Sequence, residues 1–407
     1  MKTVSVIIPN YNHGHYLANA INSILTQSFV DYEIIVVDDG STDNSREVAS
    51  SFGEKICYIW QENKGLGGAR NTGILASNSE FISLLDADDE WEPDYLEQMV
   101  HLAQKYPSGV VYYCCAQGID EIGNLLPQKF GQMVASGDVF QNLLRANFII
   151  PSTVMLRRAE LIENGLFEQD NKAIHGCEDW DLWLRLAPTY PIVGTSECLV
   201  RYRLHQNTFS AHPGKMQGAV LAVIEKHYGP DDGNENEWAS EKKRAFGGVY
   251  RYHALSEIQN LEDWESASRY LRRGLEVDPS LALDLDLFYE MAFGKQSPGY
   301  RGTEEQLNFD QNSSNIVRLL ENVFQNANVQ KTCKRQSWGT AYFAIALAAY
   351  NTGKREVSRH FFIQAIRYRS ELLFEPRVTA NLLKTYLHPT WMNQIKSIGL
   401  KQSDNKQ

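Results

Sequence analysis

The sequence predicts an α/β fold with a mostly parallel central sheet, followed by an all-α C-terminal domain. Over residues 2–76, short apolar runs alternate with amphipathic stretches of about ten residues or more, as in parallel strands joined by crossover helices. Polar residues follow these runs directly, and ligands bind at the carboxyl edge of such sheets. Beyond Met216 the pattern is helical, with a polar break at 229–236. We therefore predict two domains, residues 1–220 and 221–407.

The first domain contains strand and helix patterns in a regular order. Its strand candidates are short runs of aliphatic and β-branched residues, and its helix candidates place apolar residues on one face. The predicted strands are 4–8, 33–37, 56–60, 81–85 and 152–156, and the predicted helices are 16–26 and 43–52. Thr42 or Asp43 is a suitable N-cap for the second helix. After Tyr112 we expect a loop-rich insertion that extends to about Gly137.

Charge and composition argue against several classes of protein. Residues 1–220 carry 15 Lys and Arg against 27 Asp and Glu, a balance of 15 − 27 = −12, which does not suit a nucleic-acid binder. The six cysteines show no C-x-x-C spacing, which argues against a zinc site and against a disulfide scaffold. The longest apolar stretch, near 341–350, is too short to span a bilayer. We expect no signal peptide, no transmembrane helix and a cytoplasmic location.

The C-terminal region reverses the sign of the charge. Residues 331–407 hold 13 Lys and Arg against 4 Asp and Glu, a balance of 13 − 4 = +9. One interpretation is a helical domain with a solvated basic face, which we favour. The other is a patch for a protein partner or for anionic lipid, which would place the protein peripherally on the inner face of the membrane.

Two segments of this region have the residue spacing of the second half of a tetratricopeptide repeat. The positions are Ala267, Leu271, Gly274, Leu275 and Pro279, and again, imperfectly, Ser358, Phe362, Ala365, Ile366 and Ser370. About three repeats are needed for a self-standing solenoid, so we predict a tetratricopeptide-like appendage. Two ordinary helical hairpins explain the same pattern equally well.

A cluster of carboxylates follows the predicted strand 81–85. Asp86, Asp88 and Asp89 lie within four positions, and like charges so close together need a cation between them. Two carboxylates at i and i+2 suit a divalent metal that also holds a diphosphate. The alternative is a solvated polar turn before the helix that Pro93 opens.

Three further motifs stand at the ends of predicted strands or the start of a helix. Tyr11 follows the proline-fixed loop at Pro9 and can stack on a base, and Asp39 can accept from a pyrimidine N3–H. Arg70 lies in the glycine-rich segment 63–73 and offers a planar fork to phosphate or base. None of these signals is specific by itself.

The fifth motif, residues 177–185, begins a helix. Asp181 and Arg185 stand at i and i+4, so we expect them to pair on the surface. Glu178 and Asp179 then lie at the positive end of the helix dipole, which would keep Asp179 ionised and able to accept a proton. Simple helix capping is the alternative for this pair.

The five motifs, in this order, resemble those of the family 2 inverting glycosyltransferases of the GT-A (nucleotide-diphospho-sugar transferase) fold. The resemblance covers about residues 3–212. It implies a hexosyltransferase that takes a nucleotide-sugar donor, with UDP favoured and GDP and dTDP left open. The acceptor hydroxyl would belong to a saccharide, a lipid-linked molecule or a protein, as in polysaccharide biosynthesis.

The resemblance also implies a role for individual residues. The nucleotide would be held by Pro9, Tyr11, Asp39, Arg70 and Asp86. A divalent metal, Mn²⁺ or Mg²⁺, would be bound by Asp88 and, directly or through water, by Asp86; His205 is a further candidate near it. Asp179 matches the general base, which takes the proton from the acceptor as it attacks the anomeric carbon and inverts its configuration.

Two other classes of protein remain as alternatives. A non-catalytic scaffold could carry a degenerate transferase domain, although all five motifs keep their acidic residues. A sugar nucleotidyltransferase would need a basic, glycine-rich loop after the first strand, where this chain has Pro9 to Asn12 without Lys or Arg. We rank the nucleotidyltransferase lower.

Overall fold

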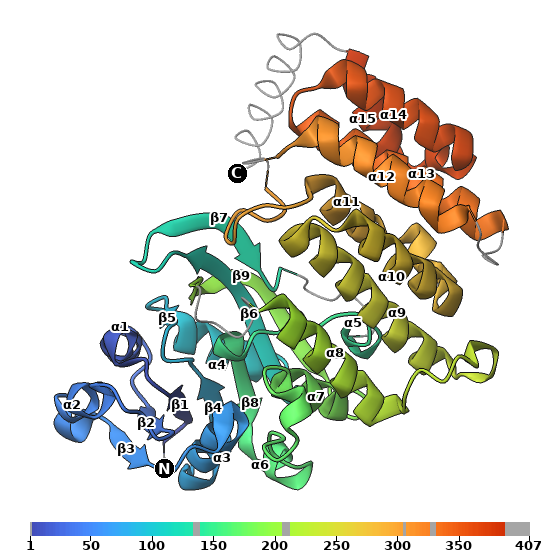
Figure 1. The fold of residues 1–407 in the computed structure, drawn as a ribbon. Coiled ribbons are helices and arrows are strands. Elements are labelled where there is room, and N and C mark those ends of the chain that lie inside the picture. The colour runs from blue at the N-terminus through green and yellow to red at the C-terminus, as the bar shows by residue number, and fades with distance from the viewer. Residues whose placement is uncertain (1, 133–138, 206–211, 304–306, 326–330, 387–407) are drawn as a thin grey trace. The chain divides into compact units, whose positions relative to one another are not determined.

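The computed structural model describes residues 2–132, 139–205, 212–303, 307–325 and 331–386 (Figure 1). Its internal contacts divide the chain into two compact units, Met1–Tyr252 and His253–Gln407. Helix α8 (Pro213–Tyr228) packs against helix α7 (Glu178–Leu186) within the first unit, so this division lies beyond residue 220. The division into domains 1–220 and 221–407 stays a prediction.

The first unit is built on a nine-stranded sheet in the described residues. The strand order is β3 (Cys57–Trp60), β2 (Tyr32–Asp38), β1 (Val4–Asn10), β4 (Phe81–Leu84), β8 (Val154–Arg157), β6 (Val111–Ile119), β9 (Ile192–Arg203) and β5 (Glu90–Trp91), with β7 (Leu125–Phe130) paired to β6. The parallel pairings β1–β2, β1–β4, β2–β3 and β6–β9 form the longest ladders. The predicted α/β fold with a mostly parallel sheet is therefore confirmed.

The helices of the first unit are α1 (Gly14–Leu25), α2 (Ser45–Ser50), α3 (Gly65–Ala76), α4 (Tyr95–Lys105), α5 (Val139–Leu143), α6 (Arg158–Glu163), α7, α8 and α9 (Ser240–Ser256). Helix α1 buries Leu17, Ile21 and Ile24 against the sheet, as its apolar face predicts. Helix α3 approaches β1 closely at Gly73, where a Cβ would lie 2.5 Å from the Ile7 side chain. This close approach holds the start of α3, and with it Arg70, near the carboxyl edge of the sheet.

The expectation of a loop-rich insertion after Tyr112 is wrong for its described part, because strands β6 and β7 run through it as an antiparallel pair. Strand β6 is buried along nearly its whole length, whereas β7 alternates exposed and half-buried residues. Such a polar strand at the edge of a sheet carries little hydrophobic signal in its sequence. The last part of the expected insertion, 133–137, lies outside the described residues.

One disulfide joins Cys115 of β6 to Cys198 of β9. The two cysteines are partners in the parallel ladder although 83 positions separate them. Their spacing gave no signal, because the pairing depends on the register of two strands that the sequence pattern does not fix. The other four cysteines are free thiols.

The second unit is all-helical in its described residues. Its α-helices are α10 (Trp264–Val277), α11 (Leu285–Phe293), α12 (Phe309–Phe324), α13 (Lys331–Asn351), α14 (Arg355–Tyr368) and α15 (Pro376–Tyr386). Ala267, Leu271 and Leu275 of α10 are buried in one core, and Phe362 and Ala365 of α14 in another. The all-α C-terminal region is confirmed, whereas its likeness to tetratricopeptide repeats stays a prediction.

Contact of the basic C-terminal region with a membrane or a protein partner also stays a prediction, and residues 387–407 of that region lie outside the described part of the chain. None of the described helices combines the length and the apolar character that crossing a bilayer requires.

Candidate active site

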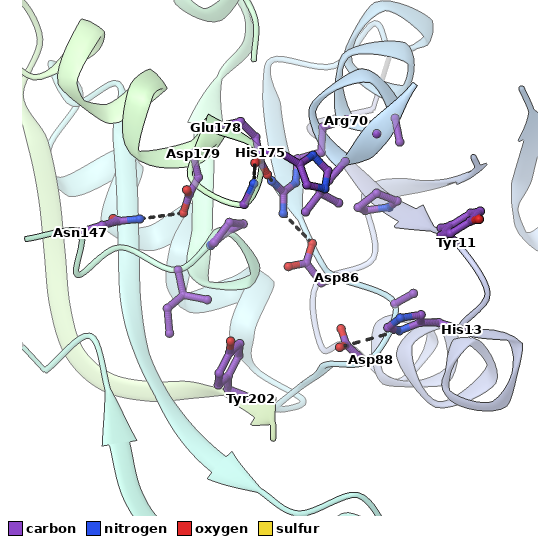
Figure 2. Close-up of a pocket in the computed structure, with 18 of the residues that line it drawn as sticks. Tyr11, His13, Arg70, Asp86, Asp88, Asn147, His175, Glu178, Asp179 and Tyr202 are labelled. Atoms are coloured by element: carbon purple, nitrogen blue, oxygen red, sulfur yellow. Dashed lines mark hydrogen bonds and ion pairs between the residues drawn. The ribbon is translucent and has the colours of Figure 1, made fainter. Parts of the chain in front are cut away.

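A cavity of about 950 Å³ opens at the carboxyl edge of the sheet in the first unit (Figure 2). All of the predicted site residues except His205 line it: Pro9, Tyr11, Asp39, Arg70, Asp86, Asp88 and Asp179. Pro9 lies at the end of β1, and Tyr11, Asp39, Asp86 and Asp88 follow β1, β2 and β4. Arg70 belongs to the second turn of α3, and Asp179 belongs to the first turn of α7. The parallel order of the strands brings together side chains that are far apart in the sequence.

The residues expected to hold the nucleotide base lie after β1 and β2. The Tyr11 side chain is 50% exposed, so a face of its ring is open to a ligand. Asp39 is buried, and its Oδ1 accepts from Gln61 Nε2 at 2.6 Å and from the Lys64 main-chain N–H at 2.9 Å. These bonds fix the Asp39 carboxylate beside the start of α3.

Arg70 forms the buried centre of the site. Its side chain is 1% exposed, and its two Nη atoms lie 2.8 Å from Asp86 Oδ1 and 2.8 Å from Glu178 Oε1. The arginine therefore ties the segment after β4 to the first residue of α7, as Figure 2 shows. The sequence suggested Arg70 as a nucleotide contact and did not suggest its partner Glu178. The contact between Arg70 and the nucleotide stays a prediction.

Asp88 points away from Arg70 and toward two histidines. Its Oδ2 lies 2.9 Å from His205 Nε2 and 3.8 Å from His13 Nδ1. The three residues each offer one ligand atom, and these atoms lie within 4.8 Å of one another. Imidazole nitrogens with a carboxylate oxygen can bind a divalent transition ion. Asp86 stands outside this group, because its Oδ1 is bound to Arg70.

His13 is a candidate ligand that the sequence reasoning missed. It lies in the run Asn12 to His15, directly after the first strand and two residues from Tyr11, a predicted site residue. A histidine that directly follows a predicted strand, close in sequence to a predicted site residue, can be taken as a candidate metal ligand. Its partners Asp88 and His205 are far away in the sequence, so the pattern alone gives no reason to group the three.

Asp89, the third carboxylate of the cluster, does not line the cavity. It is buried, and its two oxygens accept from Ser152 Oγ and from the main-chain N–H of Arg203. Asp89 therefore joins the segments around β4, β8 and β9. This role goes beyond the turn that the alternative interpretation of the sequence proposed.

Asp179 lies in the first turn of α7 and is buried. Its Oδ2 accepts from Asn147 Nδ2 at 2.9 Å, and its Oδ1 accepts from the Trp180 main-chain N–H at 2.7 Å. Burial, helped by the charge of Glu178, raises the pKa of Asp179 to about 7. The carboxylate is therefore ionised as expected only above about pH 7, because burial outweighs the charge of Arg70 and the hydrogen bonds from Asn147 and Trp180, which favour the charged form.

Asn147 contacts Asp179 across the cavity, and the sequence reasoning did not single it out. The two residues are 32 positions apart, and an asparagine before an apolar run has no distinctive pattern. Its Oδ1 also accepts from the main-chain N–H of Ile149, which fixes the orientation of the amide. Asn147 therefore presents a fixed N–H donor to Asp179.

Asp181 and Arg185 form the expected i, i+4 pair, with Nε 3.1 Å from Oδ2. The pair is not on the surface as expected, because Asp181 is fully buried beneath α8. Burial acts to raise the pKa of Asp181, but its bonds to His227, Lys226 and Arg185 outweigh burial and lower the pKa to about 2. This carboxylate secures α7, the helix that carries Asp179, to α8.

Together, the sheet topology and the cavity at its carboxyl edge define an α/β domain of the GT-A type. The profile of the family described as "Glycosyl transferase family 2" matches residues 5–166. The chain therefore contains a family 2 glycosyltransferase domain.

Curated relatives carry the same kind of name. An uncharacterized glycosyltransferase of Rickettsia prowazekii is 33% identical over 208 residues, which are 50% of this chain and 64% of that protein. An uncharacterized glycosyltransferase of Nostoc sp. is 50% identical over 105 residues, 25% of this chain and 33% of the relative. Glycosyltransferase GlyA of Streptococcus pneumoniae is 33% identical over 174 residues, 41% of this chain and 25% of the relative. The chain thus matches less than two thirds of the length of each of these proteins.

Two solved structures show a weaker likeness. A mannosyltransferase of Pyrobaculum calidifontis, in complex with GDP-Man and Mn²⁺, aligns with a TM-score of 0.48 and 15% identity over 80% of this chain and 88% of its own. Residues 1–349 of S. aureus TarS, in complex with UDP-GlcNAc, align with a TM-score of 0.46 and 16% identity over 90% of this chain and 92% of the TarS chain. At these TM-scores, neither structure identifies a substrate for this chain.

Proposed function

We propose that the chain is an inverting glycosyltransferase that moves a sugar from a nucleoside-diphosphate donor to an acceptor hydroxyl. The observation that carries this proposal is that one cavity holds two kinds of carboxylate. Asp86 and Asp88 follow a strand and lie beside basic groups, whereas Asp179 is buried and has a pKa near neutrality. Carboxylates whose environments differ in this way suit separate roles in binding the donor and in moving a proton.

The donor would lie along the ends of β1, β2 and β4. The exposed ring of Tyr11 would stack on the base beside Pro9, and Asp39 would accept a hydrogen bond from it. We favour a uridine nucleotide, because a carboxylate can accept from a pyrimidine N3–H. Arg70 would lend positive charge from the floor of the cavity, although it is already shared by Asp86 and Glu178.

A divalent cation fits the group formed by His13, Asp88 and His205. Two imidazole nitrogens among three ligands favour a transition ion such as Mn²⁺ over Mg²⁺, which prefers oxygen ligands. When bound, the ion supplies positive charge beside the departing diphosphate. The second carboxylate of the pair, Asp86, would contact the ribose or a water on the ion.

Asp179 would act as the general base. A carboxylate with a pKa of about 7 is a much better proton acceptor than an exposed aspartate, and it is still largely ionised just above neutral pH. Asp179 would take the acceptor's proton while the acceptor oxygen attacks the anomeric carbon from the face opposite the nucleotide. A single in-line displacement then inverts the anomeric configuration.

The proposal is tested with a panel of UDP-, GDP- and dTDP-sugars, each with and without Mn²⁺. Thermal unfolding identifies the nucleotide that the protein binds, since a bound nucleotide raises the midpoint temperature of unfolding. Donor hydrolysis in the absence of acceptor then identifies the sugar. A protein that is stabilised by no nucleotide and cleaves no donor would be the non-catalytic scaffold, and transfer of a nucleotidyl group from a triphosphate would identify a nucleotidyltransferase.

Asp88→Asn is expected to weaken Mn²⁺ binding by about 100-fold. Removing a residue that only supports a metal ligand typically lowers metal affinity by about 10- to 100-fold. Asp88 would be a ligand itself, so we expect a loss at the upper end of that range. Titration of the full chain with Mn²⁺, in the presence of UDP, measures the affinity directly.

The matched control for this measurement is Asp170→Asn, which removes an exposed carboxylate that does not line the cavity. Equal Mn²⁺ affinity in Asp88→Asn and in the unaltered protein would show that the histidine and carboxylate group is not the metal site.

Asn147→Ala is expected to move the pH dependence of transfer upward. The hydrogen bond from Asn147 favours the ionised form of Asp179, so its loss raises the pKa of Asp179. A hydrogen bond to a charged group contributes about 1.5 kcal/mol or more, which corresponds to about one pH unit. In the unaltered protein, kcat should rise with pH to a plateau with a midpoint near 7.

The kcat–pH profile of Asn147→Ala should keep this shape, with its midpoint about one unit higher. Asn124→Ala, at an exposed turn bonded to Asp120, is the control and should leave the midpoint in place. A lower plateau with an unmoved midpoint would mean that Asn147 contributes in some way other than through the charge of Asp179.

A further inference from the structure

The second unit contains a cavity of its own, with a volume of about 560 Å³, which residues of helices α10 and α12 line. Its lining is mainly polar and basic and includes Arg269 and Arg272 of α10 and Arg318 of α12. Glu265 is the one acidic residue among the described residues that line it. Nothing in the proposed transfer reaction uses this cavity.

The three arginines differ in how they are held. Arg272 donates from Nε to the Val323 carbonyl at 3.2 Å and from Nη2 to the Asn322 carbonyl at 2.5 Å, which fixes its guanidinium at the C-terminal end of α12. Arg269 is exposed; its Nη2 donates to Ser266 Oγ at 2.8 Å, and its Nη1 lies 3.4 Å from Glu265 Oε1. Arg318 is exposed and has no hydrogen-bond or ion-pair partner among the described residues.

This arrangement leaves positive charge without a matching negative charge. Three guanidinium groups face one cavity, and the single carboxylate in its lining is 81% exposed, so it screens them weakly. Guanidinium groups form bidentate hydrogen bonds with phosphate and carboxylate groups. An anionic ligand would supply the charge that the cavity lacks.

The remaining lining matches a saccharide. Trp264, which is half-buried against the core of this unit, also lines the cavity together with Asn315 and Asn322. An indole offers an apolar surface to the C–H face of a sugar, and amide groups can bond to hydroxyls. We propose that this cavity binds a saccharide that carries phosphate or carboxylate groups. The anionic part of the proposal rests on the arginines, whereas the choice of a saccharide rests on the proposed transferase function.

The test is a binding titration on the full chain with a hyaluronan oligosaccharide, a saccharide with regularly spaced carboxylates. We expect binding that weakens as salt is raised. The double variant Arg269→Ala/Arg318→Ala should weaken it by about tenfold or more, since each hydrogen-bonded charge pair contributes a factor of that order. Both arginines are exposed, so the variant should fold, and its circular dichroism and unfolding midpoint check this.

Arg367→Ala is the matched control, because it removes an exposed arginine of the same unit that does not line the cavity. Its affinity for the oligosaccharide should equal that of the unaltered protein. Neutral maltohexaose should bind at least tenfold more weakly, because it has no anionic group to pair with the arginines. The Asp179→Asn variant should bind hyaluronan normally, so this result does not depend on whether the transfer reaction has been assigned correctly.

Several outcomes would overturn the proposal. They are the absence of hyaluronan binding, binding that the double variant leaves unchanged, and equal binding of maltohexaose. Tighter binding of poly-glutamate than of hyaluronan would assign the cavity to an acidic peptide, and binding of inorganic pyrophosphate alone would assign it to a free anion. Either result would exclude the anionic saccharide.

Discussion

Replacement of Asp179 by asparagine is expected to lower sugar transfer by about 10²- to 10⁴-fold, the usual contribution of a general base. The amide keeps the size of the side chain but cannot take the proton of the acceptor hydroxyl. Asp39 and Tyr11, which would bind the nucleotide, do not contact Asp179, so the affinity for UDP should change little. Initial rates of transfer and calorimetric titration with UDP measure the two effects separately.

The stability of the same variant shows whether a loss of activity comes from misfolding. The pKa of Asp179 rises from 3.8 to about 7 on folding, so between these values the folded protein binds more protons than the unfolded chain. The contribution of Asp179 to stability is therefore fully present below about pH 4 and is lost as the pH rises through 7. Above pH 7 the folded protein must hold a buried, charged carboxylate, which costs stability. Asparagine stays neutral at every pH, so Asp179→Asn should be at least as stable as the unaltered protein at pH 8.

An Asp179→Asn protein that is folded and binds UDP, yet turns over at the original rate, would show that another group is the base. Asp170→Asn serves again as the control, since this exposed carboxylate does not line the cavity. Its rate and its pH profile should match those of the unaltered protein.

Arg70→Met is expected to lower the free energy of unfolding by about 3–5 kcal/mol, the usual loss when one partner of a buried ion pair is removed. Arg70 is the shared partner of Asp86 and Glu178, so the substitution leaves two carboxylates without their cation. Methionine keeps much of the aliphatic volume, which limits the contribution of a cavity. Urea unfolding followed by circular dichroism measures the change.

Arg201→Met is the control for this experiment. Arg201 and Glu92 form a close ion pair, but their side chains are 41% and 29% exposed, so the pair should contribute about 1 kcal/mol or less. A similar loss of unfolding free energy in the two variants would mean that the buried ion pairs of Arg70 contribute no more to stability than an exposed pair. Arg70→Lys should be more stable than Arg70→Met but less stable than the unaltered protein, because a single ammonium keeps the charge but cannot reproduce the two-sided guanidinium contact.

The parts of the fold that sequence analysis predicted are those with a strong local pattern. Strands β1, β2 and β4 are apolar runs that end in polar residues, and their parallel pairing brings Tyr11, Asp39 and Asp86 to one edge. The edge strand β7 was missed because it is polar along its exposed face. Periodicity identifies elements that are half buried or fully buried, and it weakens where a strand faces solvent.

It was harder to predict which residues contact one another within the site than to predict which residues belong to it. Arg70 was recognised from its glycine-rich segment, but its partner Glu178 lies 108 positions later and its pairing depends on how α7 meets α3. His13 and Asn147 were missed for the same reason, since each gains its role from a residue on a distant segment. The raised pKa of Asp179 also depends on burial, which neither the spacing nor the helix position reveals.

The bonds of Asp89 bear on how substitutions at this site should be interpreted. Because Asp89 holds the main chain of Arg203, it also sets the position of His205 two residues later, beside Asp88. Asp88 and Asp89 would thus be equally intolerant of substitution for unrelated reasons. Asp88 would bind the metal, whereas Asp89 aligns the segment after β4 with β9. A survey of tolerated substitutions would rank both as essential, so sensitivity to substitution alone does not identify the residues that touch the substrate.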